Sequence, residues 1–235
     1  MLPASVTKGT LPPDHPPLSI PPDPSYSAVC AAHASEAGRP GRCFAEEVRA
    51  TDTAREREGL GPLRLPSNFR ALTAAEQIFV LTDIERADRG LQPYRGLAAA
   101  LDASALVAAR AGVDPNLPGF RVSGALVPSW ASNWAEAFNA LDANYNWMYD
   151  DGPGSENRSC RPGQMSGCWG HRDNILWQPV QPRLGCSSFA VGAAAVASPA
   201  TGSGLASVTE IIALVSGRSP AYVYTWSQAR AAGAG

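Results

Sequence analysis

The chain has 235 residues, of which 45% are hydrophobic, and this is enough to bury a substantial core. Its formal net charge is -2, and its arginines are scattered along the chain, so it has no basic stripe for nucleic acid. The longest apolar stretch, Phe189–Ala197, is much shorter than the roughly 20 residues that span a bilayer. We therefore expect a globular protein with no nucleic-acid partner and no transmembrane segment.

The N-terminal part predicts a tail and then an extension of the main domain. Residues 1–28, which include His15, are rich in proline, which removes backbone donors and favours extended conformations, so we expect a disordered tail or linker. Residues 29–70 contain a charged run, Glu46–Glu58, in which neighbouring arginine and glutamate side chains favour a helix. We expect this extension to pack on a main domain of residues 71–235.

The main domain opens with two predicted helices. The first spans residues 73–89, because Thr73 and Glu76 form a capping box and apolar residues then recur at helical spacing. The second begins where Asp102 can cap it and ends near Gly112.

Another helix and two strands complete the predicted elements. Apolar side chains at helical spacing indicate a third helix over residues 134–150: Trp134, Phe138, Leu141, Tyr145 and Met148. A loop rich in glycine, serine, proline and cysteine then leads to a short helix over residues 171–176. Residues 184–197 and 207–216 are predicted to be strands. Because the helices precede the strands, we expect an α+β fold rather than a βαβ repeat.

The five cysteines favour an oxidised, exported protein. The pairs Cys30 with Cys43 and Cys160 with Cys168 are the disulfide candidates, because each needs little rearrangement of the chain and ties a loop that lacks core. Sequence leaves the connectivity open, and buried thiols in a cytosolic protein are an alternative. A metal site is a further alternative, with the ligands Cys160, Cys168, His171 and Cys186. Since no charged segment followed by an apolar one opens the chain, export implies that a signal peptide has been removed.

His171 is the histidine with a structured setting, at the first turn of the predicted helix over residues 171–176. The positive end of a helix disfavours imidazolium, and a neutral imidazole suits metal binding or proton acceptance. The nearby acidic candidates are Asp173 in the same segment and the pair Asp150 and Asp151, which can raise each other's pKa. Glu136 is another, although an unbroken helix would separate it from Asp150 by about 21 Å. No G-x-S-x-G sequence and no phosphate-binding glycine pattern occurs, so a Ser/His hydrolase and a nucleotide site are not expected.

Several short motifs along residues 73–217 resemble the CAP superfamily, which comprises cysteine-rich secretory proteins, antigen 5 and pathogenesis-related proteins. They are, in chain order, Ile84–Ala87, Gly90–Pro93, Asn133–Ala135, Trp147–Tyr149, Gly170–Leu176 and Leu184–Cys186. The most specific is Gly170–Leu176, which is typical of bacterial SCP-like extracellular domains, and a lysine content limited to Lys8 agrees with a GC-rich bacterial source. The resemblance implies an αβα sandwich with a small antiparallel sheet flanked by helices.

The resemblance also implies export and a cleft that, in many relatives, holds two histidines and two acidic residues for a divalent metal. His171 matches the second histidine and Asp150 stands near the second acid. The first histidine falls at about Gly112, and Ser132 replaces the glutamate before Asn133, with Glu136 as a displaced substitute. Because each lost ligand removes charge and geometry, we expect at most weak binding of a divalent metal at His171 and no cofactor.

The sequence therefore predicts a secreted binding module for a small lipid, peptide or cell-envelope component. The residues expected to bind it are His171, Glu136, Asp150, Ser132 and Asn133. The alternative is a hydrolase, such as a peptidase, with candidate catalytic residues His171, Glu136 and Asp150. The incomplete metal site argues against that enzyme. A third interpretation is a structural domain in which His171 only fixes the loop between Cys160 and Cys168.

Overall fold

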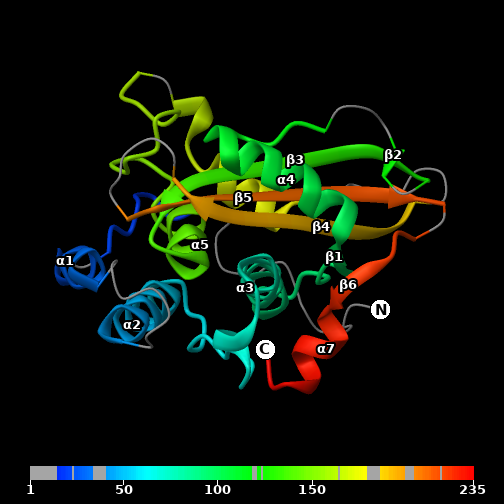
Figure 1. Cartoon of the computed structure of the whole chain (residues 1–235). Helices are drawn as coiled ribbons and strands as arrows, with labels where there is room; N and C mark the ends of the chain where they lie inside the picture. The colour runs from blue at the N-terminus through cyan, green and yellow to red at the C-terminus, as the bar shows by residue number, and fades with distance from the viewer. Residues whose placement is uncertain are drawn as a thin grey trace.

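A computed structural model describes most of the chain as one α+β protein (Figure 1). The described residues are 15–22, 24–33, 41–117, 121–122, 124–163, 165–178, 186–198, 204–217 and 219–235. The helices are α1 (Pro24–His33), α2 (Arg42–Arg57), α3 (Ala74–Asp88), α4 (Ala99–Ala111), α5 (Ala140–Met148), α6 (Gly170–Leu176) and α7 (Trp226–Ala231). The strands are β1 (Gly96–Ala98), β2 (Arg121–Val122), β3 (Ala125–Ala137), β4 (Cys186–Ala197), β5 (Ala206–Ser216) and β6 (Tyr222–Thr225). Two short 3-10 turns span Phe69–Ala71 and Met165–Gly167.

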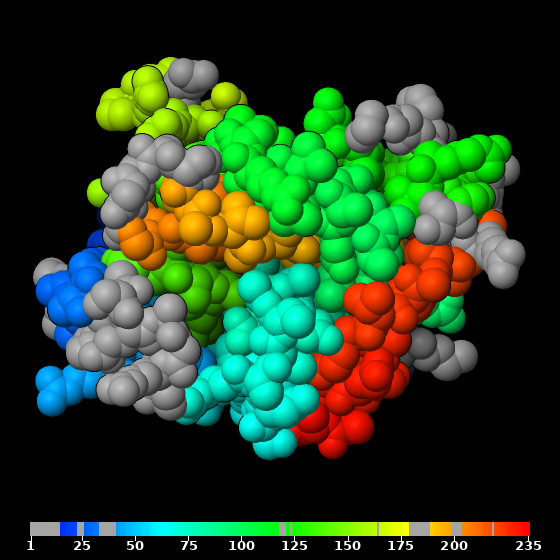
Figure 2. Space-filling view, viewed as in Figure 1, coloured from blue at the N-terminus to red at the C-terminus, as the bar shows by residue number. Residues whose placement is uncertain are grey.

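One sheet, with strand order β2-β3-β5-β4-β1-β6, separates two helical layers. In Figure 1, α4 lies on one face of the sheet, and α3 and α5 lie on the other. Figure 2 shows the same layers filled by side chains, with a strip of the sheet, in orange, visible between α4 and α3. The predicted α+β class and three-layer arrangement are confirmed. The expected sheet was antiparallel, whereas the observed sheet is mixed. Strand β1 pairs with β4 in parallel, and the other neighbouring strands pair in antiparallel orientation.

Each face of the sheet has its own hydrophobic core. On the α4 face, Leu101 and Ala105 pack with Ile211 of β5. On the α3 face, Ile78 packs with Ile212, the next residue of β5. Successive side chains of a strand point to opposite faces, so β5 contributes to both cores and is buried along almost its whole length.

The predicted extension is helical and docks on the main domain. Arg55 of α2 is buried and donates to Glu85 of α3 at 2.9 Å and also to Asp88. The segment before α1 is docked as well, because Ile20 is buried and its N–H donates to the carbonyl of Tyr149 at 2.7 Å. The division of the chain at residues 28 and 70 stays a prediction, but residues 15–22 lie on the domain.

Several predicted elements are confirmed. Helix α3 has the expected capping box, in which Thr73 and Glu76 satisfy each other's backbone N–H groups. Strands β4 and β5 form an antiparallel pair, and their bounds agree with the predicted ranges to within two residues. Both predicted disulfides, Cys30–Cys43 and Cys160–Cys168, are present. Within the described ranges, no helix is long and apolar enough to cross a bilayer.

Two predicted elements are wrong. The helix over residues 134–150 is in fact the end of β3 followed by α5, because Asn139 accepts from the N–H groups of Leu141 and Asp142 and starts a new helix. Helix α4 begins after Ala98 rather than at Asp102. The Asp102 carboxylate instead accepts from the N–H of Ala193 in β4 at 3.0 Å, so it joins helix and sheet.

Candidate functional site

The site is built on α6, which lies against the outer edge of β3. The Asn174 side chain donates to the carbonyl of Ser132 at 2.9 Å and to the Asn133 side chain at 2.9 Å. Asn133 in turn donates to the carbonyl of His171 at 3.3 Å. These amide contacts fix α6 and its histidine against β3, and Asn133 also donates to the Glu210 carboxyl of β5 at 3.2 Å.

Asp151 holds the N-terminus of α6. Its Oδ2 atom accepts from the backbone N–H of His171 at 2.9 Å and of Arg172 at 3.4 Å, where the end of a helix has no internal partners. Its Oδ1 atom lies 2.6 Å from Nδ1 of His171 and also accepts from Asn157. One carboxylate therefore caps the helix and orients the imidazole, since Nδ1–H donates to it and Nε2 is left on the other side of the ring.

His171 favours the protonated form more than a free histidine does. Burial alone lowers its pKa, but the hydrogen bond and charge of Asp151, together with the charge of Asp114, outweigh burial, so the pKa is raised above its ordinary value. Burial also raises the pKa of Asp114, and the charge of His171 opposes that shift. The expectation of a helix end that disfavours imidazolium is corrected, because Asp151 neutralises the positive end of α6.

The predicted site residues fall into two groups. Ser132 and Asn133 lie beside α6, and the Ser132 hydroxyl donates to the carbonyl of Pro115 at 2.9 Å, which ties the loop after α4 to β3. Glu136 accepts from the Ser198 hydroxyl at 2.5 Å, at the far end of β3.

Asp150 lies among Ser19, Glu156 and Asp142. Its pKa is raised to about 6, first by burial and then by the charges of Glu156, Asp151 and Asp142, and a hydrogen bond from Ser19 opposes the shift. Its Oδ1 atom is buried and has no hydrogen-bond partner among the described residues. The structure thus brings Ser132 and Asn133 to His171 and leaves Glu136 and Asp150 in other surroundings.

Three residues near the site were not among those predicted to bind the ligand, although Asp151 was named as an acidic candidate. Asp151 and Asp114 are the acidic neighbours of His171, and the signal for Asp151 was its place next to Asp150 in the sequence. His15 was expected in a disordered tail, but its Nε2 lies 2.6 Å from Asp173 of α6 and its ring stacks on Trp169. The proline-rich segment therefore contacts the same helix as the site.

Trp169 sets the turn into α6. It is the one described residue other than glycine with a positive φ, at 65°. Its indole lies against Gly152, where an added Cβ would come within 2.1 Å of the ring. Gly152 follows Asp151 directly, so this close contact helps to place the Asp151 carboxylate under α6.

The residues present fit neither metal site considered from the sequence: the site of Cys160, Cys168, His171 and Cys186, or the site that the family resemblance implies, where Gly112 and Ser132 replace two ligands. Cys160 and Cys168 form a disulfide, so their thiolates are not ligands beside His171. In the described ranges, the one group of three ligand-type side chains within 4.8 Å of one another is Cys30, Cys43 and Glu47. His171 is not part of it, and its Nδ1 is already bonded to Asp151.

The arrangement around His171 can exchange a hydrogen bond or a proton through Nε2. The ring is 23% exposed, whereas Asp151 is 2% exposed. Among the described residues, no hydroxyl or thiol is hydrogen-bonded to His171, so no nucleophile is paired with it. A hollow of about 490 Å³ lies along α2, lined in part by Val48, Asp52 and Leu60, and it includes none of the site residues.

Comparisons with known proteins do not assign a family. No protein-family model matches the chain, and no curated protein matches it. The structure is similar to that of venom allergen-like protein 4 of Schistosoma mansoni, with 15% sequence identity, a TM-score of 0.36, and coverage of 66% of this chain and 97% of that one. A likeness at this level shows no family, so membership of the CAP superfamily remains a prediction from the sequence motifs.

Proposed function

We propose that this chain is an exported, CAP-type binding module whose recognition surface is centred on His171. Two disulfides support export, because such bonds persist in oxidising compartments. The order of the motifs along residues 73–217 supports the CAP type. The ligand is a small lipid, peptide or cell-envelope component that presents an acceptor oxygen to the imidazole.

The observation that carries the proposal is the bond between Asp151 and Nδ1 of His171. Asp151 fixes the ring, and the raised pKa of His171 favours a proton on Nε2 as well. The partly exposed ring therefore presents Nε2 as a hydrogen-bond donor in a fixed direction, and binding a ligand there costs little further side-chain entropy. The lack of a paired nucleophile among the described residues favours binding over hydrolysis.

Two substitutions separate binding from structure. His171→Asn keeps a donor for Asp151 but removes Nε2, whereas His171→Gln keeps a polar group near Nε2 but loses the donor at Nδ1. The probes are laurate vesicles, a muropeptide and a short peptide, each titrated while NMR follows the His171 ring resonances of the parent and the backbone amide resonances of α6 in the parent and both variants. We expect one probe to shift these resonances, with affinity reduced about tenfold or more in His171→Asn.

The unfolding free energy in urea is measured for the same variants. We expect His171→Asn to stay within about 1 kcal/mol of the parent, because the bond to Asp151 survives. Loss of stability in His171→Asn with unchanged probe affinity would support the structural interpretation, and turnover of a probe that stops in this variant would support the hydrolase. A panel in which no probe shifts His171 would contradict the proposal.

A further inference from the structure

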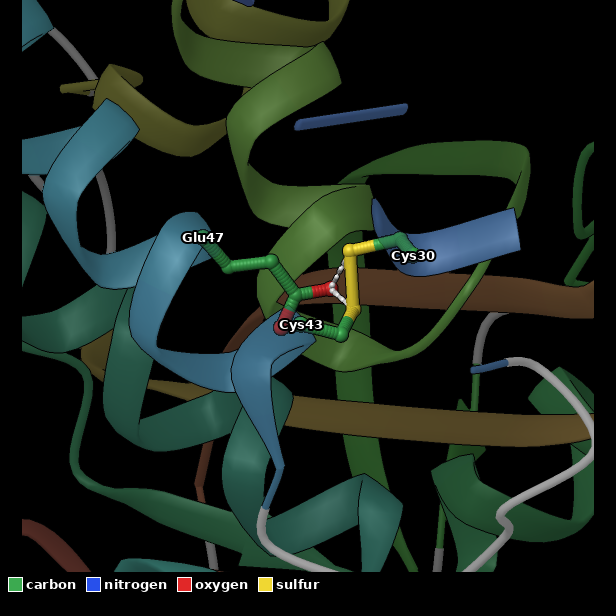
Figure 3. A group of neighbouring side chains, drawn as sticks. All are labelled: Cys30, Cys43 and Glu47. Atoms are coloured by element: carbon green, nitrogen blue, oxygen red, sulfur yellow. Dashed lines mark hydrogen bonds between the residues drawn. A yellow bond between two sulfur atoms is a disulfide. The ribbon is translucent and has the colours of Figure 1, made fainter. Parts of the chain in front are cut away.

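Glu47 lies directly against the disulfide that joins α1 to α2. Figure 3 shows its carboxyl oxygen pointing between the two sulfur atoms. Oε1 is 3.3 Å from Sγ of Cys43 and 3.8 Å from Sγ of Cys30. Cys43 and Glu47 lie one turn apart on α2, so the helix itself holds the carboxyl at the sulfur.

Among the described residues, the buried Glu47 carboxyl has no counter-charge. The residue is 1% exposed, Oε1 accepts from the Asn139 side chain at 2.7 Å, and Oε2 is buried with no partner among the described residues. The groups that face it from α1 and α5 are the Tyr26 hydroxyl and the Asp142 carboxyl, which are hydrogen-bonded to each other. Neither can neutralise a carboxylate, so the neutral acid is the favoured form.

The pKa of Glu47 agrees with this geometry. Burial, and then the charge of Asp142, raise it to about 8, against the opposing hydrogen bond from Asn139. At neutral pH the group therefore holds a proton next to the disulfide.

We propose that the Cys30–Cys43 disulfide is an exchange site for an external dithiol, and that Glu47 passes the proton to and from the departing sulfur. Cys43 is the half-buried partner and Cys30 is 1% exposed, so the incoming thiolate attacks Sγ of Cys43. The bond between the two protein sulfurs breaks, and the electron pair leaves on Sγ of Cys30. The Glu47 acid gives its proton to that buried thiolate, which has no other compensating charge in the part of the chain that the structure describes.

The second half of the exchange restores Glu47. Its carboxylate takes the proton of the second thiol of the dithiol, and that sulfur attacks the dithiol's own sulfur in the mixed disulfide. Cys43 is released as a thiolate and takes a proton from water. The dithiol loses two electrons and two protons, and the protein disulfide gains two of each.

The other disulfide is a matched control within the same chain. Cys160 is 7% exposed and Cys168 is half-buried, so its exposure resembles that of Cys30 and Cys43. Among the described residues, no carboxylate or histidine joins Cys160 and Cys168 within 4.8 Å, and Cys168 instead approaches the sulfur of Met165. The two disulfides differ in the buried acid.

The test is the ratio of the two reduction rates under dithiothreitol. Differential alkylation and mass spectrometry give both rates in one sample, and their ratio cancels the change in reagent thiolate with pH. We expect the ratio of the Cys30–Cys43 rate to the Cys160–Cys168 rate to fall as pH rises through about 8, as Glu47 loses its proton. We expect Glu47→Gln to lower the ratio about tenfold or more near pH 6 and to make it independent of pH.

A ratio for the parent that does not change with pH would overturn the proposal, whatever the variants do. Equal ratios for the parent and Glu47→Gln near pH 6, with a difference only above pH 8, would also overturn it, because Glu47 would then act by repelling thiolate. Glu47→Asp serves as a second variant that keeps the acid, and we expect a ratio between those of the parent and Glu47→Gln. If Glu47→Gln speeds the reduction of both disulfides, the substitution loosens the fold. The pH dependence of the rate ratio in the parent then decides whether the proposal holds.

Discussion

Asp151 determines both where His171 points and how readily it holds a proton. Its two oxygens divide these roles, because Oδ2 accepts from the backbone of α6 and Oδ1 accepts from the ring. A ligand that bonds to Nε2 therefore meets a donor whose direction is set by a buried carboxylate. The same carboxylate supplies the largest effect that raises the pKa of His171.

Asp151→Asn separates charge from shape at this position. We expect the pKa of His171 to fall, because an amide neither carries the charge nor accepts as strongly, and burial then dominates. The NMR titration of the His171 ring measures this shift. Glu156→Gln, an exposed change in the same loop, is the control and should leave the titration unchanged. An unaltered pKa in Asp151→Asn would mean that Asp151 does not set the proton affinity of His171.

The residues of the site were only partly predictable from the sequence. The histidine stood out because it opens a short helix after a loop, and Ser132 and Asn133 followed from the motif resemblance. Asp151 could not be distinguished from Asp150, because the choice depends on the turn at Trp169, whose positive φ no local pattern announces. Asp114 could not be predicted either, because it is far from His171 in the sequence and the two residues meet only in the folded structure.

At the scale of elements, a local sequence pattern predicted a helix or strand correctly where the pattern fits only one kind of structure. The capping box of α3 and the run of apolar residues in β5 each specify one structure. The stripe from Trp134 to Met148 failed because helical spacing alone also fits a strand that ends at Ala137 and a helix that starts after Asn139. Pairing of β3 with β5 decides that boundary, and such a pairing is a tertiary effect.

Gly192 fixes how closely α4 packs on β4. An added Cβ would lie 2.2 Å from Cβ of Leu101 and 2.3 Å from its backbone carbonyl carbon, so the helix would have to move. We expect Gly192→Ala to lower the unfolding free energy by about 1–3 kcal/mol in urea. Gly170→Ala is the control, because it meets no atom within 4 Å and begins α6; its effect should stay within about 1 kcal/mol. Equal stability of both variants would contradict the close packing of α4.

At the scale of the whole molecule, the N-terminal segments share one core with the sheet. Tyr26 of α1 and Ala54 of α2 belong to the same buried cluster as Val191 and Ile212. The docking of these segments buries acidic side chains. Glu47 of α2 is buried beneath α1, and Ser19 lies against Asp150. The molecule therefore holds protons in the folded state that the unfolded chain would release at neutral pH.

We expect this proton uptake to make the protein less stable as pH rises from about 5 to 8. The raised pKa values reach about 8 for Glu47, about 7 for Glu210 and about 6 for Asp150, and that of His171 is also raised. Above the unfolded pKa of each group, the folded state binds more protons, so the unfolding free energy falls until pH passes the folded pKa. Each proton taken up changes it by about 1.4 kcal/mol per pH unit.

Urea unfolding without reductant across this pH range measures the slope. Glu85 has the opposite effect on stability. Burial alone raises its pKa, but its arginine partners outweigh burial and lower it. The stability that Glu85 contributes is therefore lost only in more acidic solution. Glu47→Gln and Glu210→Gln should each make the slope shallower, since neither amide titrates. The unfolding free energy depends on pH only where the folded and unfolded states bind different numbers of protons. If the stability of the parent is constant or rises from about pH 5 to pH 8, these acids are already ionised in the folded protein, and the prediction is wrong.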